Sequence, residues 1–171
     1  EVVFDSLEGE THAIIGPNGA GKSTFLNVCI GKLIPDTGTV MFDGQLMTGK
    51  QPHEINQAGI VRVFQTPEIF QDLTILHNVM ISAFSKRDGE FRFNAFKSIL
   101  SENKLRQEAE SILEDLSMES MLHDHAGSLS RGDKRRLELA MSLIQKPKLL
   151  EQDEPTAGMS RIDTNQKIEL I

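Results

Sequence analysis

The sequence predicts an α/β fold with a parallel sheet, a small antiparallel β portion and an inserted helical subdomain. Short apolar runs alternate with stretches whose apolar residues recur at helical spacing, and a glycine-rich loop joins one such pair at residues 16–23. Helical periodicity then dominates from Leu73 to Leu122. We expect one domain over 1–171, with its core built from 1–68 and 127–171 and the helical subdomain from 69–126.

The first half of the chain begins with a candidate buried strand at residues 11–16, THAIIG. A helix is expected next, because Leu26, Ile30 and Leu33 recur at helical spacing, and the turn PDTG at residues 35–38 ends it. The following TVMFDG predicts a strand that closes in an Asp43-Gly44 turn, which is typical of a β-hairpin.

The second half continues the alternation. GIVRVFQ, at residues 59–65, is a β-branched run and predicts a strand. One face of a later helix is marked by Leu105, Ala109, Ile112, Leu113 and Leu116, and a face of the next by Leu137, Ala140, Met141 and Ile144. Pro147 ends that last helix, and a strand is expected in KLLEQDEPTAG.

Composition sets limits on function. The net charge of −7 argues against non-specific binding of nucleic acid, which needs a basic face. The single cysteine, Cys29, excludes an internal disulfide and fits a reducing compartment. No run of about 18 apolar residues is present to span a membrane. The chain opens on EVVFD and stops at QKIELI within an expected helix, so we expect it to be part of a larger domain.

The strongest motif is GPNGAGKS, which fits a phosphate-binding loop between a strand and a helix. Its glycines, Gly16, Gly19 and Gly21, allow backbone N–H groups to turn toward phosphate oxygens, and the helix that follows directs its positive end there. Lys22 reaches the β- and γ-phosphates and Ser23 can bind Mg²⁺. The alternative is a chance glycine turn. The nucleotide-binding residues predicted here are Gly16, Pro17, Asn18, Gly19, Ala20, Gly21, Lys22, Ser23 and Thr24.

Two further features follow predicted strands. Asp153 and Glu154 come after an apolar run, and beside a phosphate loop one carboxylate can hold Mg²⁺ while the next polarises the attacking water. A solvated acidic turn is the alternative. Gln65 ends the strand predicted at residues 59–65, near the place where strand ends meet ligands in open α/β sheets. A lone Gln at a strand end is more often a turn residue.

The stretch GSLSRGDKRRLELA begins a helix with small residues. Ser130 and Asp133 fit a capping box, and the same helix end can bind an anion. The basic run of Lys134, Arg135 and Arg136 is more often a solvated face than a ligand site.

These motifs, namely the loop, Gln65, LSRGDKRR and DEPTAG, resemble in order and spacing an ATP-binding cassette subunit. The resemblance implies that ATP and Mg²⁺ are the ligands, that Glu154 is catalytic, and that Ser23, Gln65 and Asp153 hold the metal. It also implies that the loop around Ser130 contacts the ATP of a facing subunit in a head-to-tail dimer. The residues that would act in trans are Ser130, Arg131, Gly132 and Asp133.

Within the cassettes the chain resembles the ATPase subunit of branched-chain amino-acid importers, or of related amide and urea importers. The resemblance implies membrane permease subunits as partners, a solute-binding protein as an indirect one, no nucleic acid, and a place on the cytoplasmic face of the membrane. Residues 66–71 are the candidate coupling surface. A DNA-repair cassette is a weaker alternative, because the segment before Ser130 lacks a long coiled coil, and a nucleotide-binding fragment without hydrolysis is another.

Several positions depart from the family pattern. Arg131 stands where Gly is usual, Asp133 where Gln is usual, and Ser160 where many cassettes have Asp. Glu151 and Gln152 interrupt an apolar strand. An unpaired buried carboxylate is costly, so Glu151→Leu is expected to stabilise the fold by about 1–3 kcal/mol. An adenine-stacking aromatic and a switch histidine are expected outside this chain.

Overall fold

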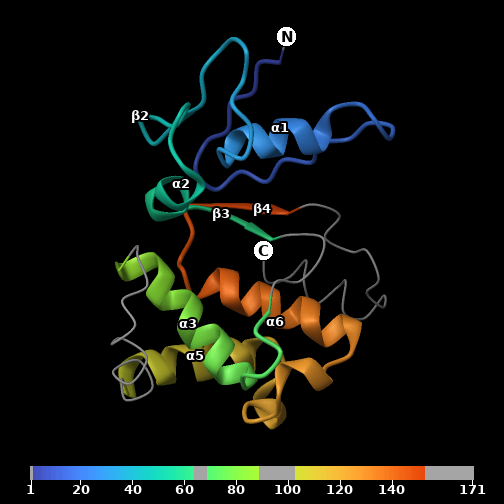
Figure 1. Cartoon of the computed structure of the whole chain (residues 1–171), viewed down its shortest axis with the longest axis vertical. Coiled ribbons are helices and arrows are strands. Elements are labelled where there is room, and N and C mark those ends of the chain that lie inside the picture. Colours follow the sequence, from blue (N-terminus) through green and yellow to red (C-terminus); the bar gives the residue numbers. More distant parts are fainter. Residues whose placement is uncertain (1, 64–68, 89–102, 153–171) are drawn as a thin grey trace.

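The computed structural model describes residues 2–63, 69–88 and 103–152. Figure 1 shows a small sheet, β3 and β4, with α1, α2 and the β1–β2 hairpin on one side and the helices α3, α5 and α6 on the other. No helix in these ranges combines the length and the apolar character needed to cross a bilayer. The expected α/β layering is therefore present, with the sheet between the two groups of helices.

The sheet is short and parallel. β3 (Ile60–Val63) pairs with β4 (Leu149–Gln152), with Ile60 opposite Leu149 and Val63 opposite Gln152. Ile60 and Leu149 pack with Ile30, Met47 and Ile55 on the α1–α2 side. Leu150, the next residue of β4, packs against the helices of the other side. The alternation of strand side chains thus assigns every residue of β3 and β4 to one of two covered faces.

The expected hairpin is present as β1 (Met41–Phe42) and β2 (Gln45–Leu46), which pair antiparallel. Asp43 and Gly44 both have positive φ, at 48° and 72°, as a two-residue turn between twisted strands requires. α2 (Pro52–Ala58) follows, and its first turn is closed by the Gln51 backbone N–H, which donates to Glu54 Oε2 at 2.7 Å.

The strand expected at residues 11–16 is wrong for the described structure. These residues pair with neither β3 nor β4, and Ile14 and Ile15 are 41% and 91% exposed. An apolar run becomes a strand only where a neighbouring strand satisfies its backbone groups, and β3 and β4 pair with each other alone among the described strands. The segment is linked to α1 through aromatic contacts instead: His12 contacts Phe4 edge to face at 5.0 Å, and Phe4 contacts Phe25 of α1 edge to face at 5.6 Å.

α1 (Lys22–Cys29) ends before the expected Leu33. Gly31 adopts φ +72° and donates its N–H to the Val28 carbonyl at 3.1 Å, which turns the chain out of the helix. A Cβ at Gly31 would lie 2.7 Å from Ile55 Cδ1 and 2.8 Å from the Lys50 carbonyl, so both backbone conformation and space demand glycine here.

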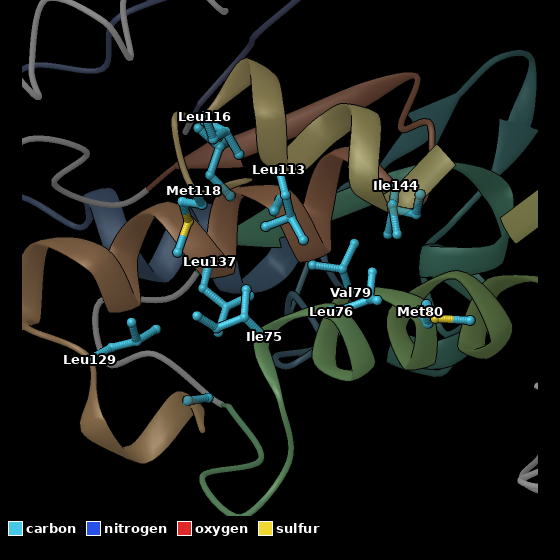
Figure 2. Close-up of a cluster of buried hydrophobic side chains, with 14 of the residues drawn as sticks. Ile75, Leu76, Val79, Met80, Leu113, Leu116, Met118, Leu129, Leu137 and Ile144 are labelled. Carbon is cyan, nitrogen blue, oxygen red and sulfur yellow. The ribbon is translucent and has the colours of Figure 1, made fainter. Parts of the chain in front are cut away.

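The largest core lies between α3 (Ile75–Asp88), α5 (Asn103–Asp115) and α6 (Arg131–Leu143) (Figure 2). The two helical faces expected from the sequence are confirmed: their members are buried here or packed against the buried cluster. Two 3₁₀ turns, Glu119–Met121 and Ala126–Ser128, connect α5 to α6. Because α6 packs on α3, α5 and β3, it joins the helical core to the sheet. The domain boundary at 126/127 stays a prediction.

Candidate functional site

The predicted phosphate loop precedes α1 and is open to solvent. Gly19 and Gly21 have φ of +82° and +89°, and no atom lies within 4 Å of a Cβ built on either, so backbone conformation alone requires glycine. Gly16 has a different reason, because its Cβ would approach Ala20 Cβ to 3.2 Å. Ala20 N–H donates to the Pro17 carbonyl at 3.2 Å and closes the turn.

Lys22 lies over this loop. Its ammonium donates to the carbonyls of Gly16 at 2.7 Å and Pro17 at 3.0 Å, although Lys22 is the first residue of α1. Ser23 and Thr24 are exposed in the first turn of the same helix. A cation, a hydroxyl and the N-terminus of α1 therefore meet at one loop, and this combination fits the oxygens of a polyphosphate.

The structure brings the strand ends for the other predicted ligands together. Gln65 follows β3 and Asp153-Glu154 follow β4, and the two strands end side by side with Val63 opposite Gln152. Gln65, Asp153 and Glu154 themselves lie outside the described residues, as do Thr66 and Ser160. In the described ranges no group of three or more His, Cys, Asp or Glu could hold a metal ion. Of the predicted Mg²⁺ ligands only the Ser23 hydroxyl is described, and its exposed position beside Lys22 fits that role.

The helix expected after the small-residue stretch is α6, and Ser130 is its N-cap. Asp133 N–H donates to Ser130 Oγ at 3.2 Å, and the Ser130 hydroxyl donates to Asp133 Oδ2 at 2.6 Å. Ser130 and Arg131 are exposed and Gly132 is half-buried. The helix end is therefore both capped and accessible, as an anion-binding helix terminus would be.

The basic run is not a solvated face throughout, and that expectation is wrong for Arg135. This side chain is only 2% exposed, with its Nη1 3.9 Å from Glu138 Oε2 one turn later. Arg136 pairs with Asp133 and donates to the Leu116 carbonyl at 3.3 Å. The helical spacing places Arg135 on the same face as the buried Leu139, four residues later, which is why the run does not form one basic surface.

α1 and α6 lie on opposite sides of the β3–β4 sheet (Figure 1). Arg62 of β3 donates from Nη1 to Asn27 Oδ1 of α1 at 2.8 Å, whereas α6 packs against β3 from the side occupied by Leu150. The sheet thus separates the helix that follows the phosphate loop from the helix that begins at Ser130. This arrangement agrees with two different phosphate contacts rather than one shared pocket.

The sequence analysis did not predict a set of hydrogen bonds, called here the clamp, that holds the backbone of residues 70–73. The Asn78 side chain is fully buried, accepts from Phe70 N–H at 2.8 Å and donates to the Phe70 carbonyl at 3.0 Å. Gly127 N–H and Ala126 N–H donate to the carbonyls of Gln71 and Leu73, both at 2.9 Å. A polar residue inside the apolar pattern ILHNVMISAF was the available signal.

Electrostatics in the described part are perturbed at few places. Burial and the Glu151 charge raise the pKa of the Cys29 thiol to about 11, which the nearby Arg62 charge partly offsets. Burial, together with the charges of His123 and Arg106, lowers the pKa of His77. Of these groups, only Cys29 lies near the elements that position the phosphate loop.

Comparison with known proteins gives consistent relatives. The sequence model of a family described as ABC transporter matches residues 1–157. A probable branched-chain amino acid transport ATP-binding protein, LivG, of Methanocaldococcus jannaschii is 38% identical over 156 residues, covering 90% of this chain and 60% of that protein. The high-affinity branched-chain amino acid transport ATP-binding protein BraF of Pseudomonas aeruginosa is 32% identical, covering 96% of this chain and 66% of that protein.

Solved structures give the same picture. The ADP conformation of MJ1267, an ATP-binding cassette of an ABC transporter, superposes with a TM-score of 0.74 at 36% identity, covering 91% of this chain and 61% of that one. A dimeric structure of MJ0796, a bacterial ABC transporter cassette, superposes with a TM-score of 0.81 at 26% identity, covering 98% of this chain and 70% of that one. The chain spans about 60% of the length of the first curated relative.

Proposed function

Because this chain belongs to the ABC transporter family, we propose that it is the ATP-binding and hydrolysing part of a subunit that powers solute import through a membrane permease. The proposed solutes are branched-chain amino acids or related amides, a class supported by the names of its relatives. The proposed place of action is the cytoplasmic face of the membrane.

One observation carries the proposal: the glycine-dependent turn at residues 16–21 places the Lys22 ammonium and the N-terminus of α1 at one exposed loop. Each group attracts anions, and their combination favours two or more linked phosphates over a single carboxylate. Lys22 exchanges its contacts with the Gly16 and Pro17 carbonyls for phosphate oxygens. A lysine held by neutral carbonyls alone makes this exchange at low cost, because a charged acceptor binds an ammonium more strongly.

The proposed hydrolysis uses residues at the ends of three elements. Ser23 at the start of α1, Gln65 after β3 and Asp153 after β4 would hold Mg²⁺, which supplies charge stabilisation to the transferring phosphoryl group. Glu154 would accept the proton of the attacking water. The parallel pairing of β3 with β4 supports this assignment, because both strands end at one edge of the sheet.

We further propose a head-to-tail dimer with a second ATPase subunit. The capped, accessible N-terminus of α6 lies across the sheet from α1, and it would present Ser130 Oγ and the Gly132 N–H to the nucleotide of the facing subunit. Arg131 is exposed at this helix end, where a cation adds attraction for the γ-phosphate. The Ser130–Asp133 cap fixes the helix end before any partner arrives.

Coupling to the permease is proposed at residues 66–71. Phe70 is 50% exposed, and its backbone is bound by Asn78 on both its N–H and its carbonyl. Gln71 is bound in turn by Gly127, three residues before Ser130. A force on Phe70 would therefore reach the segment that ends at the α6 N-terminus through backbone hydrogen bonds, without passing through a flexible side chain.

The test is nucleotide binding and turnover by the complete protein with Lys22→Ala. We expect affinity for a fluorescent ATP analogue and phosphate release to fall by at least about 100-fold, because the phosphates lose their main side-chain cation. Lys104→Ala, at an exposed position of α5, removes the same charge and should change neither. Unchanged binding in Lys22→Ala would refute the phosphate site, and binding without turnover in the wild type would refute hydrolysis.

A further inference from the structure

Polar side chains gather on the face of the sheet that α1 covers. Arg62 and Glu151 occupy register partner positions on β3 and β4. They share one face with Ile60 and Leu149, which stand two residues earlier on the same strands and pack on the α1–α2 side. Arg62 Nη1 donates to Asn27 Oδ1 at 2.8 Å and so joins β3 to α1, while Glu151 of β4 stands beside Arg62 in the register.

The position of the Cys29 thiol agrees with this arrangement. Cys29 belongs to α1, and both the Glu151 and the Arg62 charges act on it, the first raising and the second lowering its pKa. Glu151 is 7% exposed and shares the α1–α2 face of the sheet with Leu149.

Stability alone does not account for such a cluster. Taking opposite charges out of water costs several kcal/mol per ion before their attraction is counted, and well-packed apolar pairs of similar volume are often as stable or more so. Strands covered on both faces usually carry continuous apolar residues. A buried glutamate beside a half-buried arginine on a covered face of this small sheet therefore suggests a geometric role.

The three elements in the cluster are those that deliver the proposed nucleotide ligands. α1 begins at Lys22 and Ser23, β3 leads to Gln65, and β4 leads to Asp153 and Glu154. Apolar contacts permit sliding of one element against another, whereas a charge-assisted hydrogen bond such as that from Arg62 to Asn27 fixes their relative direction. The cluster thus ties the phosphate loop to both strand ends at one point.

We infer that Arg62, Glu151 and Asn27 form a positioning network that holds the phosphate-loop helix in register with the strand ends bearing the Mg²⁺ ligands and the general base. The inference rests on the proposed ATPase function. The three residues touch neither nucleotide nor water in this scheme. They fix the relative position of groups that do, and a displacement of about 1 Å in such groups can cost on the order of 100-fold in rate.

The test uses two variants of the complete protein. Arg62→Leu with Glu151→Leu removes both charges together, and Arg62→Lys keeps the charge but removes the planar fork. We expect each to lower kcat by about 10- to 100-fold and to lower the affinity gained on adding Mg²⁺ by about tenfold. Affinity for metal-free ATP should stay within about twofold, since the phosphate loop itself is intact. A purely structural role would not separate these readouts.

The control is Arg106→Leu with Glu110→Leu, which removes an exposed ion pair of 2.7 Å on α5 and should change nothing. If the double variant folds and keeps kcat and the Mg²⁺ gain within about twofold of wild type, the network is refuted. If it does not fold, Arg62→Lys decides by the same criteria. If the wild type hydrolyses ATP no faster than Lys22→Ala, the hydrolysis proposal fails. The increase in ATP affinity on adding Mg²⁺ then still tests the network.

Discussion

Asn78→Ala is expected to destabilise the protein strongly while leaving its apolar core unchanged. The Asn78 side chain is fully buried and makes two short hydrogen bonds to the Phe70 backbone, plus one of 2.9 Å to the Thr74 carbonyl. A longer bond of 3.5 Å reaches the Leu73 carbonyl. Alanine removes all four, and the Phe70 N–H and carbonyl lose this partner. At about 1 kcal/mol for each lost bond, with a further penalty for unsatisfied buried groups, the loss is about 2–4 kcal/mol.

Ser82→Ala provides the matched control on the same helix. Ser82 is also buried, but its hydroxyl donates to the Asn78 carbonyl at 3.1 Å, one turn back in α3, so its removal leaves no group without its helical partner. We expect a change below about 0.5 kcal/mol. Urea unfolding followed by circular dichroism measures both. For a chain of this size, the Asn78 loss corresponds to a fall in Tm of about 5–15 °C. Equal stability of the two variants would show that the clamp on Phe70 contributes nothing.

Three further outcomes are expected. Glu154→Gln should trap an ATP-dependent dimer that size-exclusion chromatography detects. Adding Ser130→Arg should abolish that dimer without weakening nucleotide binding. A double variant that still dimerises would refute contact in trans. Because the pKa of Cys29 is raised in the folded protein, the thiol of the unfolded chain ionises first as pH rises. The free energy of unfolding should therefore fall above about pH 9 and stop falling near pH 11. Thermal melts at pH 7.5 and 10.5 should show a smaller fall in Tm for Cys29→Ala than for the wild type. Glu151→Leu alone should destabilise by about 1–3 kcal/mol, because Arg62 keeps its charge beside an apolar neighbour, and a higher Tm would contradict this pairing.

The sequence predicted the features that depend on local chemistry. The hairpin at Asp43-Gly44, the Ser130 cap and the buried faces of α5 and α6 each follow from residues within one or two turns, and each is present. The strand expected at residues 11–16 failed for the opposite reason, since an apolar run needs a neighbouring strand and local sequence does not supply one. The early end of α1 depends on the approach of Ile55 and Lys50 to Gly31, which lies equally beyond local pattern.

Glu151 shows how a long-range neighbour reverses the sign of an energetic argument. From the sequence, a carboxylate in an apolar strand is a cost that leucine would relieve. Burial of Glu151 is confirmed, but the parallel register places Arg62 beside it, and the two positions are separated by almost ninety residues of chain. Replacing one partner then leaves a charge behind, whereas replacing both returns the strand to the apolar pattern typical of its fold. The pair therefore appears in the sequence as two unrelated exceptions, Arg62 in GIVRVFQ and Glu151 in KLLEQDEP, and only the register of β3 on β4 makes them one feature that acts at the end of α1.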